Sequence, residues 1–224
     1  MGKPFYIEIC KQAFWLLPEK AVYWPAQKML IISDIHLGKS GHFRKSGIAV
    51  PQAVFLNDLQ KLVTLIHHTQ CKTLLITGDF FHSEENKELV LFKKWLSDLK
   101  NLEIKLIMGN HDILPGSIYS RSGIECIEDC FVIEEILFIH DPENIPEAFD
   151  GYAFCGHIHP GVRIKSKAKQ SIILPCFHLT KKYCILPAFS SFAGAMPARK
   201  TKGDRFIAVA KNSLIEVVSA SFNR

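Results

Sequence analysis

Residues 29–39 are MLIISDIHLGK, in which four consecutive apolar residues are followed by a serine, an aspartate and, two positions further, a histidine. A short apolar run bounded by polar residues is typical of a strand buried on both faces. The pattern returns in TLLITGD (73–79) and in IKLIMGNHD (104–112). We therefore expect buried strands over 29–32, 73–77 and 104–108, each ending in a polar cluster.

Helical patterns separate these three runs. Apolar residues recur at helical spacing after Pro51 and again between 89 and 99. The members of the two patterns are Phe55, Leu59, Leu62 and Ile66, then Leu89, Phe92, Leu96 and Leu99. Strands that alternate with helices favour a parallel sheet with crossover helices.

The chain on either side of this region has a different pattern. After Gly123, short apolar runs separated by turns predict a β-rich, mostly antiparallel half. At the other end, runs 14–17 and 21–24 flank Pro18-Glu19-Lys20, which predicts a hairpin. We expect an α/β fold in which two sheets pack face to face with helices outside, forming a single domain over 1–224.

Composition is that of an ordinary globular protein, with 48% hydrophobic and 22% charged residues. No CxxC occurs among the seven cysteines, and most lie in apolar runs, which fits a reducing compartment. No apolar run approaches the ~20 residues that span a bilayer. We expect a soluble, cytoplasmic protein. The net charge of +5 is concentrated in clusters at 42–45, 163–169, 181–182 and 199–205, which could be solvated surface or could attract an anionic partner.

Polar side chains that suit metal binding follow five of the apolar runs. Three clusters lie in the first half and two in the second: Asp34-Ile35-His36, Asp79 with His82, 109–112, His140, and His157-Ile158-His159. The C-terminal ends of parallel strands are where α/β sites form, and alternate residues of an extended segment point the same way. Imidazole and carboxylate suit Zn, Fe and Mn, and two such ions ~3.5–4 Å apart can clamp a phosphoryl group.

Each of these clusters alone is also compatible with a hydrogen-bonded loop; the order and number of all five favour a metal site. His82 could orient a ligand or contact substrate. The remaining histidines are expected to be surface or core residues: His42, His67, His68 and His178. Cys126 and Cys130 could share a soft metal, but the absence of a second pair disfavours this.

Taken together, D-x-H, G-D-x-x-H, G-N-H-D, a later H and G-H-x-H resemble the motifs of calcineurin-like metallophosphoesterases, from Ser33 to Pro160. The resemblance implies a four-layer α-β-β-α sandwich. The segments DIHLGK (34–39), HFRKSGIAVP (42–51), GHIHPG (156–161) and LPAF (186–189) are further similar to the bacterial ligase-associated PdeM-type endonucleases, distant relatives of the Mre11/SbcD nucleases. Within these 224 residues we expect no capping domain of the Mre11/SbcD type.

The resemblance also implies roles for individual residues. One metal would be held by Asp34, His36 and His159, and the other by Asn110, His140 and His157. Asp79 would bridge the two metals. His111 would be the catalytic histidine and Asp112 would orient it. His140 is followed by Asp141-Pro142 where a glycine is common in the superfamily.

The implied function is metal-assisted phosphodiester hydrolysis with two divalent ions, Mn²⁺ in first place and Fe, Zn or Mg as alternatives. A DNA endonuclease linked to repair, with Arg44 and Lys45 on the DNA backbone and a ligase or helicase as partner, is the interpretation that the subfamily likeness favours. A phosphatase or cyclic-nucleotide phosphodiesterase would use the same site. A non-catalytic metal-binding scaffold is the alternative of a different class.

Overall fold

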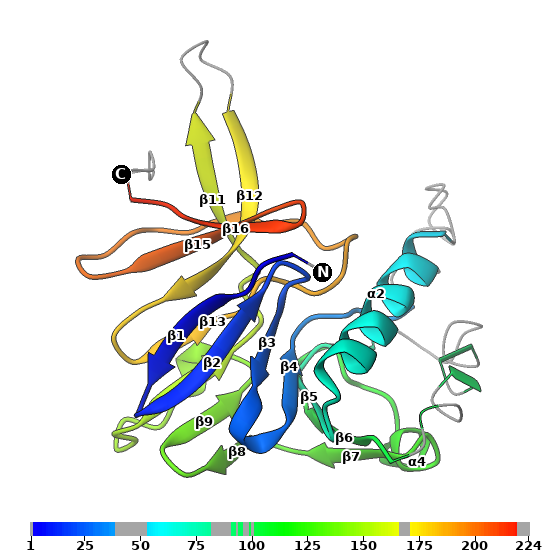
Figure 1. Cartoon of the computed structure of the whole chain (residues 1–224). Coiled ribbons are helices and arrows are strands. Elements are labelled where there is room, and N and C mark those ends of the chain that lie inside the picture. Colours follow the sequence, from blue (N-terminus) through cyan, green and yellow to red (C-terminus); the bar gives the residue numbers. More distant parts are fainter. Residues whose placement is uncertain are drawn as a thin grey trace.

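The computed structural model describes residues 2–38, 53–81, 91–92, 94–95, 99, 101–165 and 171–218. In this part of the chain two mixed sheets pack against each other (Figure 1). This confirms the expected two-sheet α/β sandwich. None of the helices in these ranges is long and apolar enough to cross a membrane.

The strands of the first sheet follow one another in sequence order. They are β1 (Phe5–Ile9), β2 (Gln12–Leu17), β3 (Ala21–Trp24), β4 (Met29–Ile32), β5 (Thr73–Thr77), β6 (Glu103–Ile107) and β7 (Ile124–Ile127). Pairing is antiparallel from β1 to β4 and parallel from β4 to β7. The predicted hairpin and the three buried strands are confirmed, with the third strand one residue earlier than expected.

Helices α2 (Ala53–Thr69) and α4 (Gly116–Ser120) connect parallel strands of this sheet. Leu62 and Leu65 of α2 pack on Leu30 and Ile32 of β4, whereas Ile31, between those two, faces the second sheet. This alternation is why the strand is apolar throughout. Of the second predicted helix, only a few residues between 91 and 99 are described, and those at 91–92 and 94–95 are helical.

The second sheet has strand order β14-β11-β12-β13-β10-β9-β8, and β15 joins β12 to β16. Its strands are β8 (Cys130–Ile133), β9 (Ile136–Ile139), β10 (Tyr152–Cys155), β11 (Pro160–Lys165), β12 (Ser171–Leu179), β13 (Tyr183–Ile185), β14 (Met196–Pro197), β15 (Arg205–Ala210) and β16 (Ser213–Glu216). Most pairs are antiparallel, as predicted, but β10 pairs in parallel with both β9 and β13, and β11 pairs in parallel with β14. The C-terminal ends of β9 and β10 therefore lie at one edge.

Aromatic side chains fill the space between the sheets. The Phe14 ring of the first sheet lies 5.0 Å from the Phe154 ring of the second, and Phe138 stacks on Phe154 at 5.9 Å. Buried aromatic pairs stabilise such a core beyond their area alone. On the other face of β9 and β10, Ile145 and Phe149 from the segment around the 3-10 turn Pro142–Asn144 cover the sheet.

Candidate metal centre

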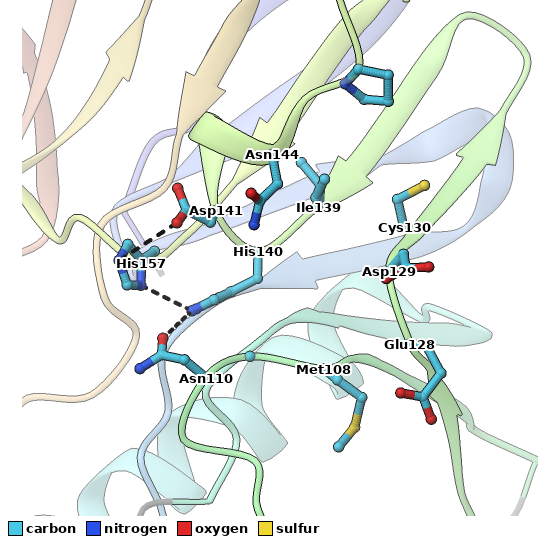
Figure 2. Close-up of a pocket in the computed structure, with 12 residues that line it drawn as sticks. Met108, Asn110, Glu128, Asp129, Cys130, Ile139, His140, Asp141, Asn144 and His157 are labelled. Carbon is cyan, nitrogen blue, oxygen red and sulfur yellow. Dashed lines mark hydrogen bonds and ion pairs between the residues drawn. The ribbon is translucent and has the colours of Figure 1, made fainter.

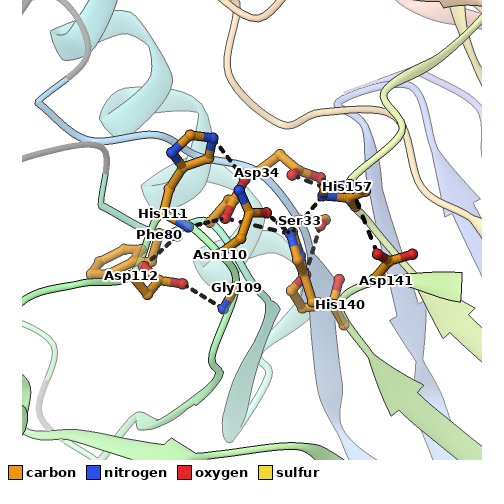
Figure 3. A network of polar contacts seen from close by, with 12 residues as sticks. Ser33, Asp34, Phe80, Gly109, Asn110, His111, Asp112, His140, Asp141 and His157 are labelled. Carbon is orange, nitrogen blue, oxygen red and sulfur yellow. Dashed lines mark hydrogen bonds and ion pairs between the residues drawn. The ribbon is translucent and has the colours of Figure 1, made fainter. Parts of the chain in front are cut away.

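The five predicted clusters converge on one place, where the strand ends of both sheets meet (Figure 3). The loops after β4, β5 and β6 come from the first sheet, and those after β9 and β10 come from the second. The structure thus brings together the seven side chains expected to bind metal: Asp34, His36, Asp79, Asn110, His140, His157 and His159.

Six of these side chains form two compact groups. Asp34, His36 and His159 make the first group, and Asp79, His140 and His157 make the second; within each, the candidate ligand atoms all lie within 4.8 Å of one another. In the first group His159 Nε2 lies 3.1 Å from Asp34 Oδ1 and 3.3 Å from His36 Nε2. In the second, His157 Nδ1 lies 3.3 Å from His140 Nε2. Each group could hold one metal ion.

Asp79 lies between the two groups. Its Oδ1 is 3.4 Å from His140 Nε2, while its Oδ2 is 3.9 Å from His36 Nε2. The side chain is 3% exposed, so its position is set by the surrounding loops. One carboxylate whose two oxygens face different groups can serve two cations at once.

Asn110 and Thr77 complete the second group. Asn110 Oδ1 lies 3.2 Å from His140 Nε2, which adds a neutral oxygen donor to this group. On the other side of the ring, His140 Nδ1 lies 2.8 Å from the Thr77 carbonyl oxygen, which can only accept. Nδ1 therefore carries a proton, so in the neutral ring it is Nε2 whose lone pair faces the group. Such a backbone partner commonly orients a metal-binding imidazole.

The backbone at the site is unusual. Five of the candidate ligands have φ between +50° and +68°: Asp34, His36, Asp79, His157 and His159. The expectation of extended backbone at the D-x-H and H-x-H motifs is therefore wrong, because these loops turn in the left-handed region. Each such residue costs on the order of 1 kcal/mol and persists only where its surroundings hold it, which is common at functional sites. The turn sends His157 and His159 to different groups.

Glycines precede two of these loops because no side chain would fit there. Gly78 has φ +87°, and a Cβ at this position would overlap the His140 ring. A Cβ at Gly156 would overlap Ser33 Oγ and crowd the Asp34 carboxylate. The G-D and G-H pairs of the sequence are thus explained by the close approach of loops from the two sheets.

Asp34 is fully buried and accepts hydrogen bonds from its neighbours. The His157 backbone N–H lies 3.2 Å from Asp34 Oδ2. Burial opposes ionisation of this carboxyl, but its hydrogen bond with His159 and the nearby imidazoles outweigh burial and hold the pKa of Asp34 below its usual value. The charged form of Asp34 is the form that could bind a cation.

The match to known proteins agrees with this geometry. Residues 27–170 match the family model of the calcineurin-like phosphoesterases. The chain belongs to this family. Among solved structures it is similar to the crystal structure of Pseudomonas putida nuclease MPE, with 29% sequence identity, a TM-score of 0.79, and coverage of 95% of this chain and 100% of that one. Comparison with curated protein sequences finds no significant match.

In this calcineurin-like phosphoesterase, His111 lies on the open side of the groups. Its side chain is 43% exposed, its Nε2 is 4.0 Å from Asp79 Oδ2, and its ring centroid is 5.6 Å from that of His36. The His111 backbone N–H donates to Asp79 Oδ1 at 3.0 Å. The ring is therefore accessible to a substrate that contacts both groups.

The hydrogen bonds of Asp112 join it to the loop backbones, so its predicted orientation of His111 would act through the loop and stays a prediction. Its Oδ1 accepts from the backbone N–H groups of Phe80 and Phe81, and its Oδ2 from that of Gly109, each at 2.9 Å. Burial raises the pKa of Asp112 to about 6, although these three bonds oppose the shift. The carboxylate ties the loop after β6 to the loop after β5, and thereby places both His111 and Asp79.

A cavity of about 810 Å³ opens beside the second group (Figure 2). Asn110, His140 and His157 form one wall, and carboxylates of Glu128, Asp129 and Asp141 lie around it. His157 Nε2 lies 3.9 Å from Asp141 Oδ2. The sequence analysis did not predict Asp141 as part of a site. The signal that could have identified it is its position directly after His140, where the family commonly has glycine.

The other predicted residues fall in different places. Arg44, Lys45, His42 and His82 lie outside the described residues, so their roles remain predictions. His67 and His68 are exposed on α2. His178 is buried, stacks on Phe206 and lies 2.9 Å from Asp204 Oδ2, as expected of a core histidine. Cys126 and Cys130 belong to no candidate metal group in the described part of the chain.

Proposed function

We propose that this chain is a dinuclear metal-dependent phosphodiesterase that cleaves nucleic acid. The position of the Asp79 carboxylate, with one oxygen toward each of the two His/Asp groups, is the observation that carries the proposal. Phosphoesterase chemistry itself follows from the family. The second ion and the nucleic-acid substrate are the parts that need a test.

The residues present fit a pair of divalent ions. Imidazole nitrogens, carboxylates and one amide oxygen are the donors that Mn, Fe and Zn share, and no thiolate belongs to either group. In the neutral His140 ring, the hydrogen bond from Nδ1 to the Thr77 carbonyl places the proton on Nδ1, and the lone pair of Nε2 could then bind a metal ion. We favour Mn²⁺, with Fe, Zn or Mg as alternatives.

The chain's own residues would then position and protonate the substrate. Bound divalent ions supply positive charge for the phosphate and lower the pKa of water. His111 reaches the open side of the groups and can stabilise charge on the phosphate or give a proton to the departing oxygen. Asp112 keeps the His111 loop in register with Asp79 through three backbone bonds.

Nucleic acid is favoured over other phosphoesters by two observations. The similar structure is that of a nuclease, and its match to this chain covers the whole length of the nuclease chain. The basic residues Lys181, Lys182, Arg199, Lys200 and Lys202 are exposed, and such residues attract a phosphate backbone. The likeness to ligase-associated endonucleases supports a role in DNA repair beside a ligase or helicase. A phosphatase or cyclic-nucleotide phosphodiesterase remains the competing activity, because the metal donors do not select the substrate.

The test compares metal content and cleavage in the same preparations. The full chain is stripped with a chelator, reloaded with Mn²⁺, Fe²⁺, Zn²⁺ or Mg²⁺, and assayed on single-stranded DNA, duplex DNA, cyclic nucleotides and aryl phosphates. We expect two ions per chain and DNA cleavage that follows metal content. Asp79→Asn should bind fewer ions and lose DNA cleavage. Asp204→Asn, which alters a carboxylate outside both groups, should keep two ions and the cleavage activity. One ion per chain would contradict the dinuclear site, and a higher kcat/KM for cyclic nucleotides would contradict the nucleic-acid substrate.

A further inference from the structure

A short segment after β13 lies directly against the backbone of Asp34. The Phe189 N–H donates to the Ser33 carbonyl at 2.8 Å, and the Ser190 N–H donates to the Asp34 carbonyl at 3.2 Å. This segment, Phe189–Ser191, contributes no candidate metal ligand. Its contacts nevertheless hold the loop that carries Asp34 and His36 of the first group.

Two lysines bind the other side of the same segment. Lys61 of α2 donates to the Phe189 carbonyl at 2.6 Å and also lies 3.8 Å from the centre of the Phe189 ring. Lys20, in the turn between β2 and β3, donates to the Ser190 carbonyl at 3.1 Å. The backbone carbonyls of two consecutive residues are thus both bound by ammonium groups.

Asp58 closes the network from α2. The Ser191 N–H donates to Asp58 Oδ2 at 2.8 Å, and the Ser191 hydroxyl donates to Oδ1 at 2.7 Å. Lys61 Nζ lies 3.2 Å from Asp58 Oδ1, so the carboxylate also partners one of the two lysines. Asp58 is only 5% exposed.

The energetic cost of this network indicates a purpose other than stability. Burying charged groups costs several kcal/mol each before pairing, and apolar side chains of similar volume commonly stabilise a core as well or better. The Glu19 carboxylate also acts on Lys61, and burial, with repulsion from Lys61, lowers the pKa of Lys20 to about 8. Asp34, at φ +55°, is a strained residue that its surroundings must hold.

We propose that Asp58, Lys61 and Lys20 are positioning residues that set the Asp34 carboxylate for the first metal ion. They act through Phe189–Ser191, which transmits the position of α2 to the Asp34 carbonyl. The inference rests on the proposed function, because it assigns a role toward the metal that Asp34, His36 and His159 would bind. Loss of an outer partner of a metal ligand typically weakens metal affinity about 10- to 100-fold.

The experiment titrates Mn²⁺ into the metal-free full chain and follows the free ion by its electron paramagnetic resonance signal. We expect Asp58→Asn and Lys61→Met, which reach Asp34 only through Phe189–Ser191, to weaken one of the two binding steps about 10-fold, the low end of that range, and to leave the other unchanged. Lys61→Arg, which keeps a cation, should restore part of the loss. Ser191→Ala removes only one bond to Asp58 and gives a milder variant if the others fold poorly.

Asp204→Asn is the matched control, because it disrupts another partly buried network, with His178 and Thr201, outside both metal groups. If Asp58 and Lys61 only stabilise the fold, their variants will have a lower Tm, as this control does, but will bind both Mn²⁺ ions with wild-type affinity. That result would overturn the inference. A wild-type chain that binds fewer than two ions would instead overturn the proposed function and this inference with it.

Discussion

The Thr77 carbonyl and the His140 ring join the two sheets at the candidate site, with 2.8 Å between the Thr77 oxygen and His140 Nδ1. Thr77 is the last residue of β5, and His140 directly follows β9. This hydrogen bond therefore links the two sheets at this edge and also favours one tautomer of a candidate ligand. A site built in this way depends on how the two sheets are packed as well as on the ligands themselves.

Replacement of His140 by alanine should remove one metal ion per chain. The second group would keep Asp79, Asn110 and His157, but Nε2 of His140 is the atom that the others surround. We expect turnover to fall at least about 100-fold and metal content to halve, as measured by elemental analysis. His178→Ala removes another buried, carboxylate-paired ring and should retain both ions. Two ions per chain in His140→Ala would contradict the ligand assignment.

Replacement of His111 by asparagine should spare the metals and slow the chemistry. The His111 ring is exposed and 4.0 Å from the nearest oxygen of Asp79, so neither group loses a donor. General acid catalysis contributes about 10²- to 10⁴-fold, and it matters most where the leaving group is poor. We therefore expect a larger fall in kcat for a DNA phosphodiester than for an aryl phosphate. Equal falls on the two substrates, with metals intact, would argue against proton donation by His111.

Removal of the charges at Arg44 and Lys45 should weaken DNA cleavage and leave small substrates unaffected. Both residues follow soon after the first cluster in the sequence, and a cation on a DNA phosphate releases a counterion on binding. The Arg44→Ala/Lys45→Ala chain should show a higher KM for DNA and a shallower salt dependence of kcat/KM. Lys28→Gln/Lys72→Gln, which removes two exposed charges just before β4 and β5, at the strand ends away from the site, is the control. If the variant shows the same salt dependence of kcat/KM as the wild type, Arg44 and Lys45 do not contact DNA.

Much of the site was predictable because each ligand follows a buried apolar run. A run such as 73–77 leaves the polar residues after Thr77 at a strand end, and the parallel order of β4, β5 and β6 brings those ends together. The parallel pairing of β9, β10 and β13 was not predictable, because a four-residue apolar run has the same pattern in either direction.

The local turns were less predictable than the strands. A one-residue gap in H-x-H predicts two side chains on the same side, whereas the left-handed backbone at His157 and His159 sends them to different groups. Their assignment to separate metals came from family resemblance and not from spacing. Asp58 and Lys61 belong to no recognisable sequence motif. The only signal was that these two charged residues adjoin the buried positions Leu59 and Leu62 of the same helix.

Truncation of Phe154 to alanine tests the packing between the sheets. This fully buried ring contacts both Phe14 of the first sheet and Phe138 of the second. Phe→Ala substitutions in cores cost about 3–5 kcal/mol, and urea unfolding should show a loss of this size in the free energy of unfolding. Tyr6→Ala, at a 60% exposed position, should cost much less. Similar losses in the two variants would contradict the sandwich core.

Because of Lys20, the free energy of unfolding should rise with pH above about 8. Burial lowers the pKa of Lys20 in the folded chain from 10.5 to about 8, so between these values the unfolded chain binds more protons and folding becomes more favourable as pH rises. At about 1.4 kcal/mol per pKa unit the gain is at most roughly 3 kcal/mol. Asp58 and Lys61, the charged groups that face Lys20, are unchanged in Lys20→Met, so urea unfolding of the two chains between pH 7 and 10 isolates this gain. Lys105 provides a control of opposite sign, because hydrogen bonds with Glu125 and Glu103 raise its pKa. The stability that Lys105 contributes is therefore present below pH 10.5 and is lost only above that pH. A stability difference between wild type and Lys20→Met that stays constant from pH 7 to 10 would show that the Lys20 ammonium is not buried as described.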